Sequence, residues 1–184
     1  MRYLASSAQL RAHLLRWCLV TIPAILVLGF VSARVSGSGP GNVWFDALNK
    51  PPLYPPPETF AIVWPVLYLM MGLALAMVLS ARGASGRGLA VGSFLIQLAL
   101  NLAWSPLFFR AHEVVAAFWV IVALLVLITI TIGLFLRVRV GAGLLLVPYL
   151  IWLMFAALLN WQFDALNPDA VTIRGTGAEV HIRL

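Results

Sequence analysis

Uncharged amide and aromatic side chains at helical spacing are the residues of this sequence best suited to hold a ligand. They form three groups, each on one helical face: Trp64 and Tyr68; Gln97, Asn101 and Trp104; and Trp152 and Asn160, which share their face with the small Ala156. Amides are costly against lipid, so these faces should point into a helix bundle. There they could join helices by hydrogen bonds or orient a ligand, and the aromatic residues alone could form an interfacial belt. Their coincidence on the same faces favours a cavity for a flat, mostly apolar molecule.

The remaining polar residues argue against catalysis and metal binding. His13, His112 and His181 lie far apart, and Cys18 is the only cysteine. Their spacing matches no metal site, and no Ser-His-acid set can be placed within one site. No carboxylate lies within an apolar stretch to relay protons, which disfavours an ion-coupled pump or exporter. The sequence therefore predicts no catalytic residues and no metal site, and it favours a binding protein.

The elements that must position these residues are five stretches without a charged side chain, at 17–33, 60–81, 88–109, 114–136 and 140–163. Each can cross a lipid bilayer as a helix. A 62% hydrophobic composition and a mean hydropathy of +1.00 leave too little polar surface for a soluble domain of 184 residues. The sequence predicts an all-α membrane protein, a five-transmembrane-helix bundle at 17–163, between an N-terminal segment 1–16 and a C-terminal tail 164–184. The first stretch could alternatively be a secretory signal peptide.

The net charge of +6 is distributed unevenly between the two predicted sides of the membrane. The side that holds the N-terminus has basic residues and no carboxylate: Arg2, Arg11, Arg16, Arg82, Arg87, Arg137 and Arg139. The other side holds every acidic residue together with the remaining basic ones. By the positive-inside rule, this asymmetry predicts a cytoplasmic N-terminus and a C-terminus on the outer side. The excess of basic residues thus indicates how the chain is oriented in the membrane, and nucleic-acid binding is disfavoured.

The connection between the first two predicted helices, residues 34–59, is much longer than the other loops. Loops of this length are usually functional or disordered. Its prolines lower the entropy cost of ordering it, and Trp44, Phe45 and Tyr54 can anchor it. We therefore expect this loop to pack over the mouth of the bundle, on the outer side. The tail 171–184 alternates apolar and polar residues around Gly-Thr-Gly, which suits either a hairpin or a disordered segment.

Small residues form another face of the third predicted helix, opposite its amides: Gly88, Gly92, Ala99 and Ala103. Gly88 and Gly92 have the spacing that lets two helix backbones approach closely in lipid. The stripe predicts either a homodimer interface or a close contact within one chain.

Four segments together resemble the TspO/translocator protein family, also called tryptophan-rich sensory proteins or peripheral-type benzodiazepine receptors. They are 44–51 (WFDALNKP), 55–68 (PPPETFAIVWPVLY), 97–109 (QLALNLAWSPLFF) and 148–160 (PYLIWLMFAALLN). The resemblance implies a five-helix bundle, usually homodimeric, that binds tetrapyrroles such as protoporphyrin IX and haem in a pocket capped by the first loop. Some members also bind sterols or benzodiazepine-type compounds. The family's ligand-lining positions match Tyr68, Gln97, Asn101, Trp104, Trp152, Ala156 and Asn160, with Trp44 as a lid.

Two departures from the family pattern bear on function. Leu53 stands where the family commonly has an aromatic residue, which together with the position of Trp152 is connected with light-dependent porphyrin breakdown. After Asn160 the fifth helix lacks the tyrosine and basic residue of sterol-binding members. The resemblance therefore favours a tetrapyrrole-binding sensor or carrier and makes sterol a weaker candidate. The alternatives are a weak light-dependent porphyrin-degrading enzyme and a membrane scaffold without ligand.

Overall fold

A computed structural model describes residues 7–39 and 41–170. Its elements are α1 (Ser7–Ser36), α2 (Val43–Ala47), α3 (Pro57–Ser80), α4 (Arg87–Ser105), the π-helical turn η1 (Pro106–Arg110), α5 (Val114–Val138), α6 (Val140–Leu144) and α7 (Val147–Leu166). Five helical segments in these residues are long and apolar enough to cross a membrane: Ala8–Ser36, Pro57–Ser80, Arg87–Arg110, Val114–Val138 and Val140–Leu166. The predicted five-helix membrane bundle is confirmed, although its first helix begins earlier than expected.

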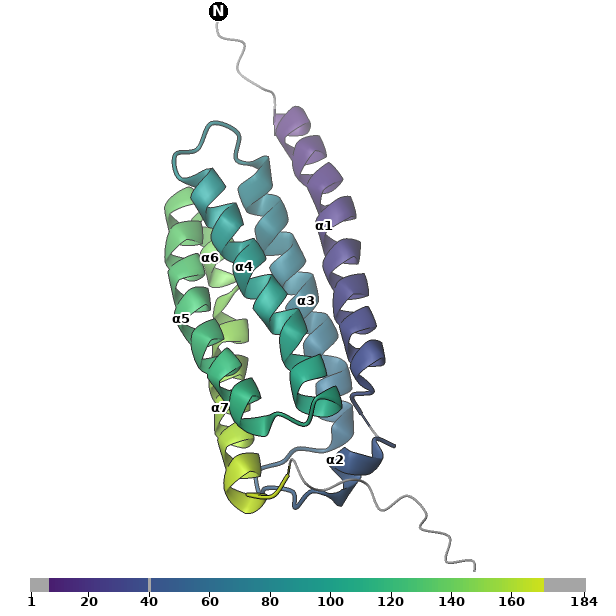
Figure 1. The fold of residues 1–184 in the computed structure, drawn as a ribbon. Coiled ribbons are helices and arrows are strands. Elements are labelled where there is room, and N and C mark those ends of the chain that lie inside the picture. Colours follow the sequence, from purple (N-terminus) through teal and green to yellow (C-terminus); the bar gives the residue numbers. More distant parts are fainter. Residues whose placement is uncertain (1–6, 40, 171–184) are drawn as a thin grey trace, which may run out of the picture.

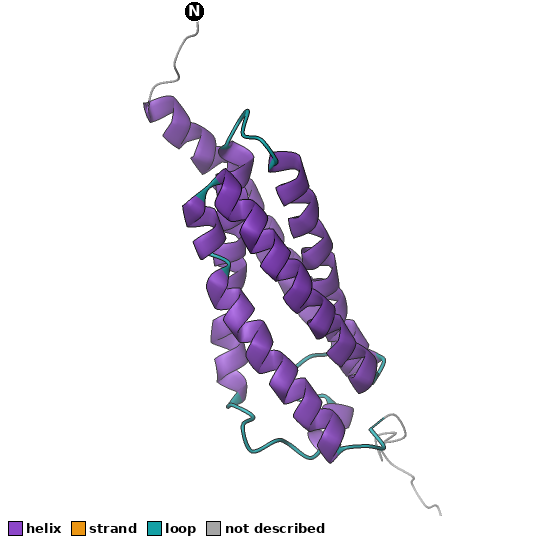
Figure 2. Ribbon diagram, turned by 90° about the vertical axis from the view of Figure 1, so that its left-hand side faces the viewer, coloured by secondary structure: helices purple, strands orange, loops and turns teal. Residues whose placement is uncertain are grey.

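The long helices run side by side in alternating directions (Figure 1). α1 packs along α3, α4 along α5, and α5 along α7, while α1 also touches α4 and α3 touches α6. These contacts close the five segments into a bundle. The view in Figure 2 shows the longer loops gathered at its two ends. Because the connections after α3, α4 and α5 are short, successive long segments are antiparallel, as the loop lengths predict.

Two glycines allow α1 and α3 to pack closely. A Cβ atom built on Gly72 of α3 would lie 2.8 Å from the Cα of Ile22, so no larger residue fits there without moving α1. The Thr21 hydroxyl donates to the Gly72 carbonyl at 2.8 Å. In the other direction, Gly29 of α1 makes room for the ring of Tyr68. Small residues at such contacts are the usual basis of helix association in lipid.

The fifth apolar segment is interrupted between α6 and α7. α6 ends at Leu144, and Pro148 stands in the first turn of α7. A proline is tolerated at that position because its missing N–H would have no partner inside the helix. The fifth apolar segment is therefore broken just before Pro148 and continues as a new helix.

The first loop packs onto the bundle, as predicted. It contains the short helix α2, whose N-cap residue Asn42 accepts a hydrogen bond from the Phe45 N–H at 2.9 Å. Trp44, Phe45 and Leu48 are buried in an apolar cluster with residues of η1, α5 and α7: Phe108, Val114, Ala117 and Phe163. This cluster fastens the loop to one end of the bundle. The hairpin expected at 171–184 lies outside the described residues.

Within the described residues, the acidic side chains gather at one end of the bundle, whereas basic side chains lie at both ends. The start of α1 and the α3–α4 loop share one end, which carries Arg11, Arg16, Arg82 and Arg87. The end that holds α2 carries the acidic residues Asp46, Glu58, Glu113 and Asp164. Which end faces the cytoplasm stays a prediction.

Candidate ligand cavity

A cavity of about 840 Å³ lies in the half of the bundle next to α2. Every long segment and the first loop contribute residues to its wall, and most of these residues are apolar or aromatic. Its aromatic lining residues are Phe30, Phe45, Tyr54, Phe60, Trp64, Tyr68, Trp104, Phe108, Phe109, Trp152 and Phe163. The volume lies within the range of about 300 to 1,000 Å³ that is typical of small-molecule sites.

Aromatic side chains of α3 and α7 form one wall of the cavity. Trp152 of α7 meets Phe60 edge to face, with ring centroids 5.7 Å apart, and Trp64 at 6.5 Å. Tyr54 of the first loop stacks on Phe60 at 5.5 Å. Edge-to-face and offset arrangements of this kind are the favourable ones for aromatic pairs. These contacts hold the rings of the wall against one another.

The inner end of the cavity is closed by a hydrogen-bonded set from three helices. Asn101 of α4 is buried, and its Oδ1 accepts from the Tyr68 hydroxyl of α3 at 3.1 Å. The Asn101 Nδ2 donates to the Tyr149 hydroxyl of α7 at 2.8 Å. Both ends of the amide are therefore used within the protein. Asn101 is a structural link between helices as well as a residue of the cavity wall.

A similar link joins α4, α7 and α5 nearer the first loop. The Trp104 Nε1 donates to the Asn160 Oδ1 at 3.3 Å, and the Asn160 Nδ2 donates to the Val114 carbonyl at 2.9 Å. Val114 is the first residue of α5. Asn160 thus ties α7 to the start of α5 and orients the indole of Trp104, whose ring is part of the cavity wall.

Phe45, Tyr54 and Lys50 bring the first loop to the cavity mouth. The Lys50 Nζ lies 4.1 Å from the centroid of the Phe45 ring. It donates to the carbonyls of Phe45 and of Leu48, the latter at 3.2 Å. Partial burial lowers the pKa of Lys50, and the charge of Asp46 opposes that shift. Burial, with a smaller effect from Asp46, raises the pKa of the Tyr54 phenol, so it stays a neutral donor.

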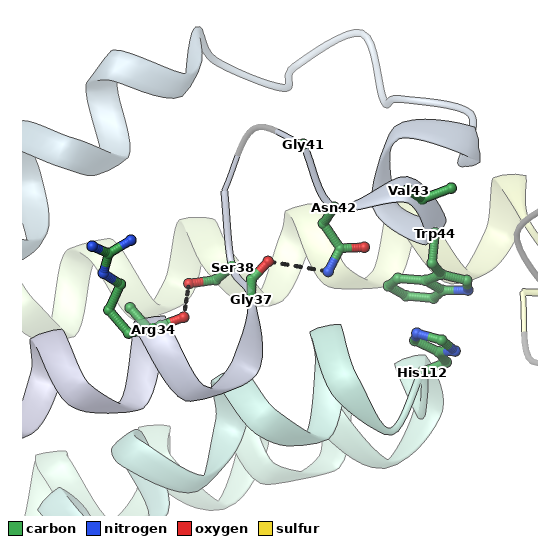
Figure 3. Close-up of a pocket in the computed structure, with 9 residues that line it drawn as sticks. Arg34, Gly37, Ser38, Gly41, Asn42, Val43, Trp44 and His112 are labelled. Atoms are coloured by element: carbon green, nitrogen blue, oxygen red, sulfur yellow. Dashed lines mark hydrogen bonds between the residues drawn. The ribbon is translucent and has the colours of Figure 1, made fainter. Parts of the chain in front are cut away.

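Trp44 lies outside the lining of this cavity. Its ring stacks on His112, with centroids 4.2 Å apart and planes 11° apart, and Figure 3 shows the two rings lying flat against each other. The Trp44 Nε1 donates to the Ala170 carbonyl at 2.9 Å. Both residues border a separate pocket of about 600 Å³ at the end of α1, together with Arg34 and Asn42. Trp44 fastens the loop to the bundle from the side away from the cavity.

The structure gathers most of the sequence-predicted ligand residues around one space. Those that line it are Tyr68, Asn101, Trp104, Trp152, Ala156 and Asn160. Gln97 does not line it. Gln97 is fully buried, and neither its Oε1 nor its Nε2 has a hydrogen-bond partner in the described residues. Whether any of these residues contacts a ligand stays a prediction.

Sequence reasoning missed the wall that α1 supplies. Leu26, Gly29 and Phe30 line the cavity, although the first apolar stretch has no amide or aromatic pattern that singles them out. It also missed Lys50, which was noted only as part of a motif. The signal available for Lys50 was its position, since a cation within a loop that caps an apolar bundle can contact a ligand held there.

The small-residue stripe of α4 faces away from the rest of the chain. Gly88, Ala99 and Ala103 are exposed, and Gly92 is half-buried. A Cβ atom built on Gly88 or Gly92 would meet no described atom within 4 Å. Within the described residues, the alternative of a close internal contact at these glycines is therefore wrong.

A bundle of five membrane-crossing segments around an aromatic cavity defines an integral, multi-pass membrane protein with an internal site of ligand size. The chain belongs to the TspO/MBR family, whose model matches residues 19–166. The resemblance found in the sequence motifs is thereby confirmed.

Relatives from bacteria and animals match most of the chain. The tryptophan-rich protein TspO of Chlorobaculum tepidum is 40% identical over 144 residues, covering 78% of this chain and 90% of that protein. The tryptophan-rich sensory protein of Cereibacter sphaeroides is 36% identical over 124 residues, covering 67% and 77%. The translocator protein of Bos taurus is 37% identical over 139 residues, covering 73% and 80%.

Proposed function

We propose that the cavity binds a tetrapyrrole, a porphyrin or haem, and that the protein acts in the membrane as a sensor or carrier of that ligand. The observation that carries this proposal is the aromatic cavity of about 840 Å³ beneath the first loop. A flat conjugated macrocycle suits such walls, because ring faces supply stacking contacts over a large apolar area. The names of the relatives, sensory protein and translocator protein, agree with either role.

The lining favours recognition of the ring over coordination of a metal at its centre. Among the described residues, no His, Cys or Met side chain lines the cavity, so these residues offer a haem iron none of its most common axial ligands. The amides of Asn101 and Asn160 already have partners within the protein. Affinity should therefore come mainly from the fit of an apolar ring, and free-base porphyrin should bind without help from a metal.

Saturable quenching of tryptophan fluorescence by protoporphyrin IX, with the protein in detergent, tests the proposal. Trp64, Trp104 and Trp152 all line the cavity, so a bound porphyrin would lie close to them. Ala156→Phe adds a ring to the cavity wall and should lower affinity by about tenfold, equivalent to about 1.4 kcal/mol. Met154→Phe is the matched control, because Met154 lies on the same helix and is 60% exposed away from the cavity. Equal effects of the two variants would place porphyrin binding elsewhere.

The same titration separates the proposed sensor or carrier from two alternative functions. Light-dependent loss of porphyrin absorbance would indicate a degrading enzyme, for which Trp152 is in place; Leu53, however, is exposed and outside the cavity lining. No saturable quenching at all would indicate a scaffold without ligand. Cholesterol serves as the comparison ligand, and we expect weaker binding of the sterol than of porphyrin.

We also propose that the protein forms a homodimer through the small-residue stripe of α4. The exposure of Gly88, Ala99 and Ala103 and the open space beside Gly88 and Gly92 support it. A second copy of the same helix could approach closely along such a surface.

A further inference from the structure

The charged groups of the cavity are confined to its mouth. Within residues 7–39 and 41–170, the charged residues that line it are Asp46 and Lys50, and both belong to the first loop. The lining from the long helices is uncharged. The cavity therefore combines an apolar body with a polar end at the loop. A ligand that matches this pattern has a flat apolar body with a charged group at one edge.

The geometry of Lys50 suits it to pair with an anionic group. Its ammonium is held over the Phe45 ring and donates to two uncharged carbonyls, those of Phe45 and Leu48. An ammonium has three donors, so one of them is available for a further acceptor. A carboxylate is a stronger acceptor than a carbonyl for a charged donor. The position of the ammonium is set before any ligand arrives, which lowers the entropy cost of the contact.

We propose that Lys50 is an anion-binding residue of the cavity, which pairs with a carboxylate at the edge of the bound ligand. The inference rests on the proposed tetrapyrrole-binding function and deepens it. It assigns the ligand class as an acidic amphiphile, bound with its apolar ring between the helices and its acid group beneath the first loop.

Asp46 is the opposing group at this mouth. Its charge stabilises the ammonium form of Lys50. It also repels an incoming carboxylate, so it limits the gain that the ligand obtains from Lys50. Removal of the Asp46 charge should therefore strengthen binding of an acid ligand, whereas removal of the Lys50 charge should weaken it.

The test compares protoporphyrin IX with its dimethyl ester, which has the same ring and no carboxylate. Affinities for both are measured by fluorescence quenching on the full-length parent protein and on Lys50→Met. The parent should prefer the acid. In Lys50→Met, affinity for the acid should fall by about tenfold, the size expected for loss of one charge-assisted hydrogen bond. Affinity for the ester should change less than about twofold, since the ester makes no ion pair with Lys50.

Two control variants separate the ion pair from other effects. Arg34→Met removes a nearby cation that borders the neighbouring pocket and does not line the cavity, so it should leave the acid-to-ester ratio unchanged. Lys50 also donates to the loop carbonyls, and Lys50→Gln can still donate there without a charge. It should lose the preference for the acid even if Lys50→Met does not fold.

The outcomes distinguish this inference from the function on which it rests. If both porphyrins bind and the acid-to-ester ratio is unchanged in the neutral Lys50 variants, the tetrapyrrole site stands and the anion-binding role is overturned. The anion-binding role is likewise overturned, and the tetrapyrrole site stands, if the parent protein binds the acid and the ester equally well. If neither porphyrin binds saturably, the proposed function fails, and this inference fails with it.

Discussion

The ring of Tyr68 on α3 occupies the space that a side chain at Gly29 of α1 would fill. Any Cβ atom at Gly29 would overlap that ring. The contact does more than bring two helices together, because Tyr68 lines the cavity and donates to Asn101 at its inner end. Gly29 of α1 thus decides where Tyr68, a residue of the cavity wall, stands.

Gly29→Ala should lower porphyrin affinity even though alanine is the better helix former. The added methyl group would displace Tyr68, which disturbs the cavity wall and its bond to Asn101. Gly133→Ala is the matched control: it adds the same methyl group within α5, where the new Cβ atom would meet no described atom within 4 Å apart from its own helix backbone. In Gly133→Ala, the gain in folding free energy of about 0.5 to 1 kcal/mol from the better helix former should remain. Its affinity for porphyrin should be unchanged. Equal affinities of the two variants, measured by fluorescence quenching, would contradict the structural reading of Gly29.

Asn101→Leu should lower stability more than it lowers affinity. The substitution leaves the half-buried Tyr68 and the buried Tyr149 without the amide partner of their hydroxyls. Each buried polar group left unsatisfied costs about 1 to 3 kcal/mol. Thermal unfolding in detergent, followed by far-UV circular dichroism, measures the first effect, and porphyrin titration of the folded variant measures the second. A stable variant with strongly weakened binding would instead make Asn101 a direct ligand contact.

Trp44→Ala should loosen the first loop without changing the cavity wall. The variant loses the stack on His112 and the hydrogen bond to Ala170. We expect faster limited proteolysis within 34–59 and a weaker affinity that reflects the cost of ordering the loop. Leu53→Ala is the control, because Leu53 belongs to the same loop and is 53% exposed. If proteolysis of the two variants is equally slow, Trp44 is not what fastens the loop.

Gly88→Leu combined with Gly92→Leu should weaken dimerisation by about 1 to 2 kcal/mol, a rough scale for close helix contacts in lipid. The fold of the single chain should survive, because these positions face open space. Gly72→Leu gives the contrast, since a Cβ atom there would press against the backbone of Ile22 and should destabilise the bundle itself. Cross-linking in bilayers measures the dimer fraction. An unchanged fraction would remove the stripe as the dimer interface.

Reporter fusions at residues 2 and 184 should place the N-terminus in the cytoplasm and the C-terminus on the outer side. The expectation follows from the excess of basic residues at the end of the bundle where α1 begins. The first loop and the cavity mouth would then open toward the outer side. Activity of a cytoplasm-only reporter at residue 184 would reverse that assignment.

Much of the architecture could be predicted because its signals are local in the chain. A run of about twenty uncharged residues has to form a helix in a bilayer, since its backbone groups find no other partners there. Short loops then force neighbouring helices to be antiparallel. Helical spacing alone was enough to place Trp152, Ala156 and Asn160 on one face, and all of them line the cavity.

The residues that each helical face contacts were decided by the tertiary structure alone. The sequence singled out Trp44 as a lid, yet its ring lies against His112, outside the cavity lining, while Phe45 and Lys50 turn toward the mouth. The partners of Asn101 come from helices far away in the chain. In lipid, both the inner and the outer face of a helix are apolar, so hydrophobicity carries little information about helix rotation. Small residues such as Gly29 and Gly72 set that rotation through contacts that exist only once two helices have met.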